Sequence, residues 1–308
     1  MDCSIIPTRF PGLFQVSTTD FFFPLVEDPY LLGRIAACNV LSDMYALGLH
    51  HCDNVLMLLA ASTKMPEAHR DVVTHLIMRG FNDLCLSAGT KVTGGQTTRN
   101  AWPLIGGVAM ATAAASDFIR PELARPGDLL VLTKPLGTQV VVNLHQWADS
   151  LKDRWEANKL DAVMTRAQVD AAFDTACESM ARLNRNAAVL MHKYSAHGAT
   201  DVTGFGIKGH ATNLCKNQLA DVDFVIDAFP VIKDVLRVDE YLGHRFNLRA
   251  GGAAETSGGI LCVLPAENAQ PFIDELQQLD GKPAWIIGRV VEGTKQCIFS
   301  PDLNIIEV

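Results

Sequence analysis

The order of apolar and polar positions along the chain predicts a mixture of strands and helices. Residues 13–19 alternate in polarity, as a half-buried strand does, and this strand ends at Asp20. Short apolar runs predict further strands at residues 55–60, 104–114, 129–133, 224–226, 260–264 and 285–291. Helical spacing of apolar residues predicts helices at residues 30–47, 66–88, 168–193 and 271–279, and one continuing past His210. The mixture indicates an α+β protein without the strict βαβ alternation of a doubly wound sheet.

Local signals mark helix ends and a domain boundary. Asp28 followed by Pro29 is typical of a helix start, and Gly89 of a helix end. Residues 124–128 are polar and turn-forming and precede a strong strand signal, so we place the boundary there. This gives an N-terminal domain of residues 1–124 and a C-terminal domain of residues 125–308, in line with about two domains of roughly 150 residues each.

Composition and charge narrow the class of protein. Hydrophobic residues make up 48% of the 308-residue chain and charged residues 19%, which suits a sizeable core and excludes a disordered chain. The net charge of −8, without a long basic run, argues against nucleic acid as a partner, because phosphate-backbone binding needs clustered Lys and Arg.

The cysteines and the apolar runs indicate the compartment. The eight cysteines are scattered and none forms a CxxC pair, which is typical of free thiols in a reducing compartment. No segment resembles a signal peptide, and no apolar run reaches about 18 residues. We therefore expect a cytoplasmic protein without membrane contact.

Four aspartates stand in separate short polar motifs beside apolar stretches: Asp2, Asp20, Asp43 and Asp201. A carboxylate next to buried apolar residues is costly unless it is paired or binds a metal ion. Mg²⁺ prefers hard oxygen ligands and is commonly held by carboxylates together with substrate phosphates. A nucleoside triphosphate with metal ions would account for all four acids. Asn39 lies four residues before Asp43, so both project from one face of the predicted helix.

A glycine pair between these motifs suits phosphate binding. Gly94 and Gly95 stand before Gln96 and Thr97, and the backbone N–H groups of a glycine turn can approach a phosphate closely. An ordinary turn is the simpler interpretation of these four residues taken alone.

Other sequence patterns do not support a dinucleotide fold, a zinc site or a P-loop. Residues 204–209 fit the GxGxxG pattern, but the polar residues 197–203 before them do not predict a strand, so we expect no dinucleotide fold. Residues 50–53 (His-His-Cys-Asp) are adjacent and cannot all converge on one tetrahedral zinc ion. The chain has no Walker A sequence, which excludes a P-loop ATPase.

Six motifs in order resemble those of one known family. They are TTD (18–20), DPYLLGRIAACNVLSDMYALG (28–48), TGGQT (93–97), ARLNR (181–185), ATDVTGFGIKGH (199–210) and ETSGG (255–259). Over its whole length the chain resembles the selenophosphate synthetases (selenide, water dikinases), and among them the eukaryotic members. The resemblance implies a two-domain α+β fold like that of aminoimidazole ribonucleotide synthetase (PurM-like). It also implies a homodimer in which the N-terminal domains pair, with ATP near the dimer interface.

The resemblance implies roles for individual residues. The implied Mg²⁺ ligands are Asp2, Asp43 and Asp201. The implied nucleotide-binding residues are Asp2, Asp20, Asp43, Gly94, Gly95, Gln96 and Thr97. The implied partners are ATP and selenide, and the implied reaction converts ATP, selenide and water to selenophosphate, AMP and phosphate, supplying selenium for selenocysteine synthesis.

The reactive arm of the family has no counterpart in this sequence. Family members carry a glycine-rich segment with a Cys or selenocysteine and then a Lys ahead of the first Asp. Cys3 follows Asp2 instead of preceding it, so we expect a structural thiol there, no catalytic residue in this chain, and the catalytic residues upstream of Met1.

Two alternatives stay open from the sequence. The chain could be a non-catalytic, nucleotide-binding homodimeric paralogue that regulates selenium or redox metabolism. It could also be a related ATP enzyme that acts on an amide, like the aminoimidazole synthetases.

Overall fold

The chain forms two compact units in a computed structural model that describes residues 2–308. Unit 1 contains the chain up to Ile119 together with Ala181–His192, and unit 2 contains Arg120–Met180 and Lys193–Val308. Residues 181–192, which the predicted C-terminal domain contained, therefore fold with unit 1.

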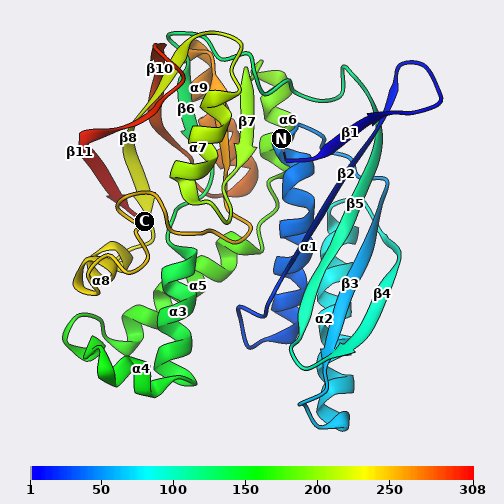
Figure 1. The fold of residues 1–308 in the computed structure, drawn as a ribbon, viewed down its shortest axis with the longest axis vertical. Coiled ribbons are helices and arrows are strands. Elements are labelled where there is room, and N and C mark those ends of the chain that lie inside the picture. The colour runs from blue at the N-terminus through cyan, green and yellow to red at the C-terminus, as the bar shows by residue number, and fades with distance from the viewer. Residues whose placement is uncertain (1) are drawn as a thin grey trace. The chain divides into compact units, whose positions relative to one another are not determined.

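Unit 1 is a five-stranded sheet with two long helices. Its elements are β1 (Ser4–Pro7), β2 (Leu13–Phe22), α1 (Pro29–Ala46), β3 (Asn54–Ser62), α2 (Glu67–Ser87), β4 (Val92–Asn100), β5 (Leu104–Ala114) and α6 (Arg185–Lys193, whose last residue belongs to unit 2). The strand order is β1-β2-β5-β3-β4, antiparallel except for β3 and β4, which are parallel and joined by α2. Figure 1 shows α1 and α2, in blue and cyan, running along this sheet.

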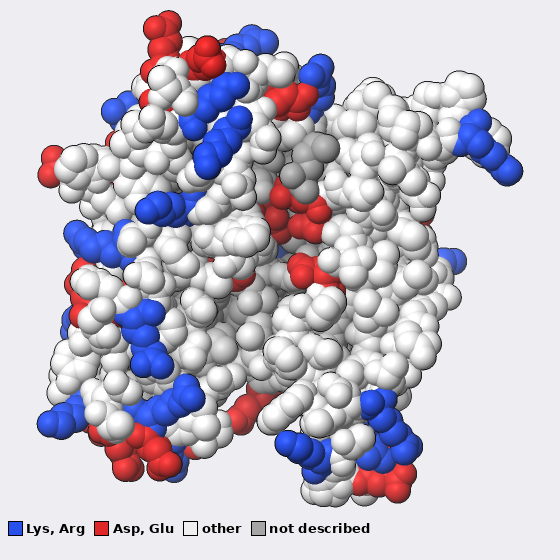
Figure 2. All heavy atoms as spheres, viewed as in Figure 1, with Lys and Arg blue, Asp and Glu red and all other residues white. Residues whose placement is uncertain are grey.

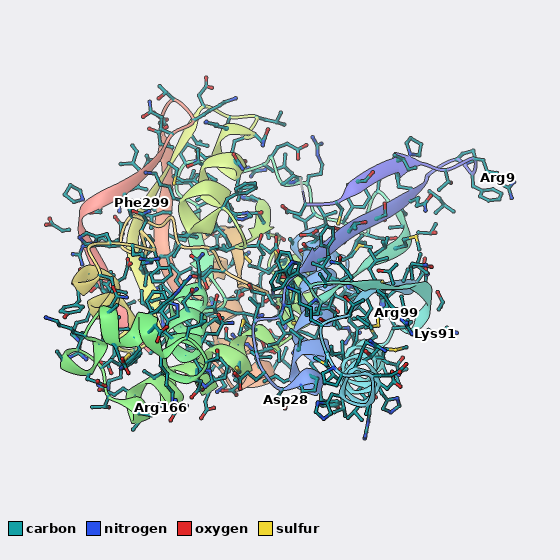
Figure 3. All side chains as sticks on the ribbon, turned by 60° about the horizontal axis from the view of Figure 1, so that its bottom comes forward. Arg9, Asp28, Lys91, Arg99, Arg166 and Phe299 are labelled. Atoms are coloured by element: carbon teal, nitrogen blue, oxygen red, sulfur yellow. The ribbon has the colours of Figure 1, made fainter. Side chains whose placement is uncertain are left out.

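Helix α1 begins where the sequence predicts. The Asp28 carboxylate accepts hydrogen bonds from the backbone N–H groups of Tyr30, at 2.8 Å, and Leu31, at 3.2 Å. These bonds satisfy donors that the first helical turn leaves open, so the predicted cap is confirmed. Asp28 is labelled in Figure 3 at the start of the helix.

Helices α1 and α2 contact each other through two glycines. A Cβ atom at Gly33 of α1 would lie 2.1 Å from the carbonyl oxygen of Ile77, and one at Gly80 of α2 would lie 1.9 Å from that of Tyr30. No side chain fits at either place, so the two backbones approach as closely as glycine allows.

The segment after α5 turns back onto α1. Asn184 Nδ2 donates to Ser42 Oγ at 3.1 Å, and Cys38 Sγ donates to the carbonyl of Arg182 at 3.0 Å. The single helix predicted at residues 168–193 is therefore wrong: the structure has two helices, with the ARLNR turn between them bound to α1.

Unit 2 is a six-stranded sheet with helices. Its elements are β6 (Leu129–Leu132), α3 (Thr138–Asp149), α4 (Lys152–Ala157), the short 3₁₀ helix η1 (Leu160–Ala162), α5 (Arg166–Met180), β7 (Gly198–Asp201), α7 (Gly206–Lys216), β8 (Val222–Val231), α8 (Val235–Tyr241), β9 (Ile260–Leu264), α9 (Ala266–Asp280), β10 (Trp285–Glu292) and β11 (Cys297–Glu307). The strand order is β11-β8-β10-β6-β9-β7, antiparallel except for β11 and β8.

The predicted strands are all present, but four further predictions about elements are wrong. Residues 94–97 lie inside strand β4 rather than in a turn, and Asp20 lies inside β2 rather than at its end. Residues 197–203 contain strand β7, although they are polar. The helix predicted at residues 271–279 begins earlier, at Ala266, and includes Pro271.

The distribution of charged side chains on the surface and the state of the cysteines agree with the expectations from composition. On the face in Figure 2, Lys and Arg side chains are dispersed among acidic and uncharged ones. All eight cysteines are free thiols. Among residues 2–308, no helix combines the length and apolar character needed to cross a membrane.

Candidate functional site

Two hydrogen-bonded pairs link the acidic residues of β2 and α1. Asn39 Nδ2 donates to Asp20 Oδ2 at 2.5 Å, and Thr18 Oγ1 donates to Asp43 Oδ2. Residues two apart on a strand share a face, as do residues four apart on a helix. The two periods therefore bring both carboxylates and their donors to one place between β2 and α1.

The Asp20 carboxylate is held in a partly desolvated position. Burial raises its pKa above the usual value of 3.8, and the hydrogen bond from Asn39 lowers it only in part. Desolvation disfavours the charged form of the acid, so a cation beside it would stabilise the carboxylate.

The position of Asp2 near the same helix follows from the contacts of the next residue, Cys3. Cys3 is buried, and its Sγ lies 3.9 Å from Sδ of Met44. Cys3 follows Asp2, and Met44 follows Asp43, so the start of the chain lies against the part of α1 that bears Asp43. The expectation that Cys3 is buried is confirmed.

Residues 94–97 lie on β4, at the edge of the sheet. Gly95 has a φ of +135°, and a Cβ there would lie 1.9 Å from the carbonyl oxygen of Met57, so only glycine fits against β3. All four residues are exposed; Figure 3 labels Lys91 and Arg99 on either side of them. Because β5 and β3 separate β2 from β4, the segment lies about 14 Å from Asp20 across the sheet. The structure does not bring it beside the acidic pairs of its own unit.

Asp201 ends strand β7 in unit 2 and is 2% exposed. It lies opposite Ile260 of β9, and the next residue, Val202, donates its N–H to the carbonyl of Gly259 at 2.9 Å. Because β7 and β9 are antiparallel, the GxGxxG residues that follow are not part of a parallel βαβ unit.

The 255–259 motif, to which the sequence alone gives no physical role, contacts residues 134–138 close to the end of β7. The Glu255 carboxylate accepts from Gly137 N at 2.7 Å, from Thr138 N at 2.9 Å and from the Thr138 hydroxyl. Lys134 is 1% exposed, and its Nζ donates to the carbonyl of Ser257 at 2.8 Å. Burial raises the pKa of Glu255 to about 7. The 255–259 segment thus fixes the start of α3.

The same segment also holds the turn that follows Asp201. Glu255 N donates to the carbonyl of Thr203 at 3.0 Å, and a Cβ at Gly258 would lie 2.0 Å from the carbonyl oxygen of Val202. Residues 134–138, 201–204 and 255–259 therefore form one hydrogen-bonded cluster in unit 2.

Sequence reasoning missed some of these residues. Thr18 gave a signal, because it lies two residues before Asp20 and so on the same face of the strand. Glu255 and Lys134 gave none, because each contacts residues more than 100 positions away in the sequence.

The 50–53 run is held by backbone contacts. Cys52 Sγ donates to the carbonyl of Asn54 at 3.3 Å, and Asp53 Oδ2 accepts from Thr112 N at 2.7 Å. Within residues 2–308, no group of three or more His, Cys, Asp or Glu side chains is preformed to hold a metal ion.

Family models match both halves of the chain. Residues 1–113 match the N-terminal domain of AIR synthase related proteins, and residues 125–299 match their C-terminal domain. Among solved structures, the chain resembles AaThiL complexed with AMPPCP and TMP (TM-score 0.72, 18% identity, 97% of this chain and 86% of that one). It also resembles the hydrogenase maturation protein HypE in complex with ATP (TM-score 0.71, 17% identity, 96% and 83%). Fold and site thus define a two-domain protein of the AIR synthase related class, which confirms the predicted PurM-like fold.

Curated relatives narrow the class to one family. The chain is 50% identical to selenide, water dikinase of Dictyostelium discoideum over 99% of this chain and 83% of that protein. It is 50% identical to selenide, water dikinase 2 of Homo sapiens over 100% of this chain and 68% of that protein. The chain belongs to the selenide, water dikinase family.

Proposed function

We propose that the chain provides the ATP- and Mg²⁺-binding residues for selenophosphate synthesis from ATP, selenide and water, with AMP and phosphate as the other products. The observation that carries the proposal is the pair of carboxylates of Asp20 and Asp43, gathered between β2 and α1 in a chain of this family. In-line phosphoryl transfer depends on positioned groups and charge neutralisation more than on covalent chemistry by the scaffold.

The donor set of unit 1 fits Mg²⁺. Its oxygens are hard ligands, and the desolvated Asp20 carboxylate gains from a nearby cation. Since no closed set of three protein ligands is preformed among the described residues, the ion would take its remaining ligands from water and nucleotide phosphates, as Mg²⁺ commonly does. We assign Asp2 and Asp43 as ligands in unit 1 and Asp201 as a ligand in unit 2. When bound, Mg²⁺ would neutralise phosphate charge.

A homodimer would supply the nucleotide-binding residues 94–97. Two strands separate this segment from Asp20, but β4 is an exposed edge strand that a second copy can approach. On β2, Leu13 and Phe21 point away from Asp20 and are 37% and 57% exposed, with the polar residues Gln15, Ser17 and Thr19 between them, and pairing with a second copy would cover these two apolar side chains. We infer that Gly94, Gly95, Gln96 and Thr97 of one protomer bind nucleotide held by the aspartates of its partner.

The alternatives are less well supported. The relatives are named dikinases, which favours an enzyme over a non-catalytic paralogue. An amide-directed ATP enzyme would release ADP, whereas the proposed reaction releases AMP. Eight free thiols support a cytoplasmic location.

The test uses phosphorus NMR on the full-length protein, given ATP, selenide and Mg²⁺. We expect selenophosphate, AMP and phosphate, and we expect Asp43→Asn and Asp201→Asn each to lower turnover and to weaken Mg²⁺ binding about tenfold or more. Asp153→Asn, an exposed site on α4, is the matched control and should behave as the parent protein. ADP as product, or unchanged Mg²⁺ binding in both Asn variants, would contradict the proposal.

A further inference from the structure

A histidine to which the proposed function gives no role in binding Mg²⁺ or ATP holds the turn after Asp201. His210 lies on α7 and is 8% exposed. Its Nε2 lies 3.0 Å from Thr203 N, 3.2 Å from Thr203 Oγ1 and 3.4 Å from Phe205 N. Helix α7 has no side-chain cap of its own at Phe205, so the imidazole reaches back from inside the helix to the backbone that precedes it.

These contacts determine the tautomer and the protonation state of the imidazole ring. Backbone N–H groups only donate, so Nε2 must accept, and the ring proton must sit on Nδ1 of a neutral imidazole. Burial lowers the pKa of His210 to about 4, in agreement with a neutral ring.

The other side of the turn is already fixed. Val202 N donates to Gly259 O, and Glu255 N donates to Thr203 O. Gly206 has a φ of +65° and packs against the carbonyl oxygen of Gly251. Without the imidazole, the half-buried N–H of Thr203, two residues after Asp201, would lose its acceptor.

We propose that His210 is a positioning residue: it holds the turn after β7 so that the Asp201 carboxylate is fixed for Mg²⁺. The inference rests on the proposed function, because it needs Asp201 to be a ligand. It assigns His210 no contact with the substrate. Leaving the Thr203 N–H without its acceptor is unfavourable, so the turn is expected to shift at Thr203 N when the imidazole is removed.

The test compares variants by calorimetric titration of Mg²⁺ in the presence of a non-hydrolysable ATP analogue. His210→Leu keeps much of the volume but removes the acceptor, and we expect it to weaken Mg²⁺ binding about tenfold. His210→Gln restores an acceptor and should return affinity to within about threefold of the parent. For turnover, the Leu variant should show a raised KM for Mg²⁺ with a smaller change in kcat.

His197→Leu is the matched control, because His197 is also a largely buried histidine of unit 2, with Nδ1 2.8 Å from Asp128 Oδ2. It should lower the melting temperature without weakening Mg²⁺ binding. Unchanged Mg²⁺ affinity in His210→Leu, with weakened affinity in Asp201→Asn, would overturn the inference alone. Unchanged affinity in Asp201→Asn would overturn the inference and also remove Asp201 from the site.

A spectroscopic measurement covers the case in which the Leu variant does not fold. Long-range ¹H–¹⁵N NMR of the parent protein at neutral pH should show His210 as the neutral tautomer with its proton on Nδ1. A proton on Nε2 would overturn the inference, because that nitrogen could not then accept from Thr203 and Phe205.

Discussion

Glu255 illustrates, at the scale of single residues, how burial and hydrogen bonding compete. Its carboxylate accepts from Gly137 and Thr138 at the start of α3, which favours the charged form. Burial favours the neutral form and is the larger effect, so its pKa rises from 4.5 to about 7. The folded chain therefore binds a proton at Glu255 more tightly than the unfolded chain.

This difference predicts a pH dependence of stability. Relative to Glu255→Gln, which cannot titrate, the free energy of unfolding of the parent should fall by about 3 kcal/mol between about pH 4.5 and 7 and stay level above that range. Urea unfolding of both proteins at several pH values measures it. Glu292→Gln, at an exposed site, should show no such difference from the parent. A constant difference between the parent and Glu255→Gln across this range would contradict the prediction.

Single residues differ in how far the sequence reveals them. Asp20 and Asp43 stand out because an acid in an apolar stretch is costly, and Asn39 follows from helical spacing. That Thr18 lies on the same face as Asp20 can be inferred only once the strand is known to continue through Asp20. His210 and Glu255 could not be assigned a role, because only the folded chain brings their backbone and hydroxyl partners within reach.

At the scale of elements, the close contact between helices α1 and α2 determines how unit 1 packs. Helix α1 carries Asn39 and Asp43, so its position against α2 also affects where these side chains lie. Glycine at Gly33 and Gly80 costs helix propensity, yet both backbones need the space.

Gly80→Ala tests this crossing. Helix propensity alone predicts a gain of up to about 1 kcal/mol, whereas overlap with the backbone oxygen of Tyr30 predicts a loss of about 1–3 kcal/mol. We expect the loss to prevail, since the oxygen cannot rotate away, and thermal unfolding measures it. Gly204→Ala, where a Cβ meets no atom within 4 Å, is the control for stability. A more stable Gly80→Ala protein would show that the helices separate at low cost.

Elements with long or regularly spaced sets of apolar residues were predicted well, such as α1, α2 and β5. The sequence failed for β4 because that strand is a polar, exposed edge held by backbone hydrogen bonds to β3, which leave no apolar pattern. It failed for the break between α5 and α6 because the apolar spacing continues through the ARLNR turn, whereas contacts with α1 end the helix.

Pairing of two copies is the prediction at the scale of the whole molecule. The exposed Leu13 and Phe21 on the outer face of β2 and the distance between residues 94–97 and Asp20 both favour a second protomer. We expect the protein to sediment as a dimer and Phe21→Glu to sediment largely as a monomer, because a charge would have to be buried in the interface. Leu279→Glu, at an exposed site on α9 in unit 2, should stay dimeric. A monomeric parent protein would contradict the homodimer, and a dimeric Phe21→Glu protein would contradict pairing through the face that bears Phe21.

Metal-dependent nucleotide binding is the central claim, and calorimetric titration with a non-hydrolysable ATP analogue, with and without Mg²⁺, tests it most directly. We expect binding that requires Mg²⁺, because the aspartates repel the phosphates unless a cation lies between them. Equal binding without the metal ion, or no binding in either condition, would contradict the claim that these aspartates form a Mg²⁺-ATP site.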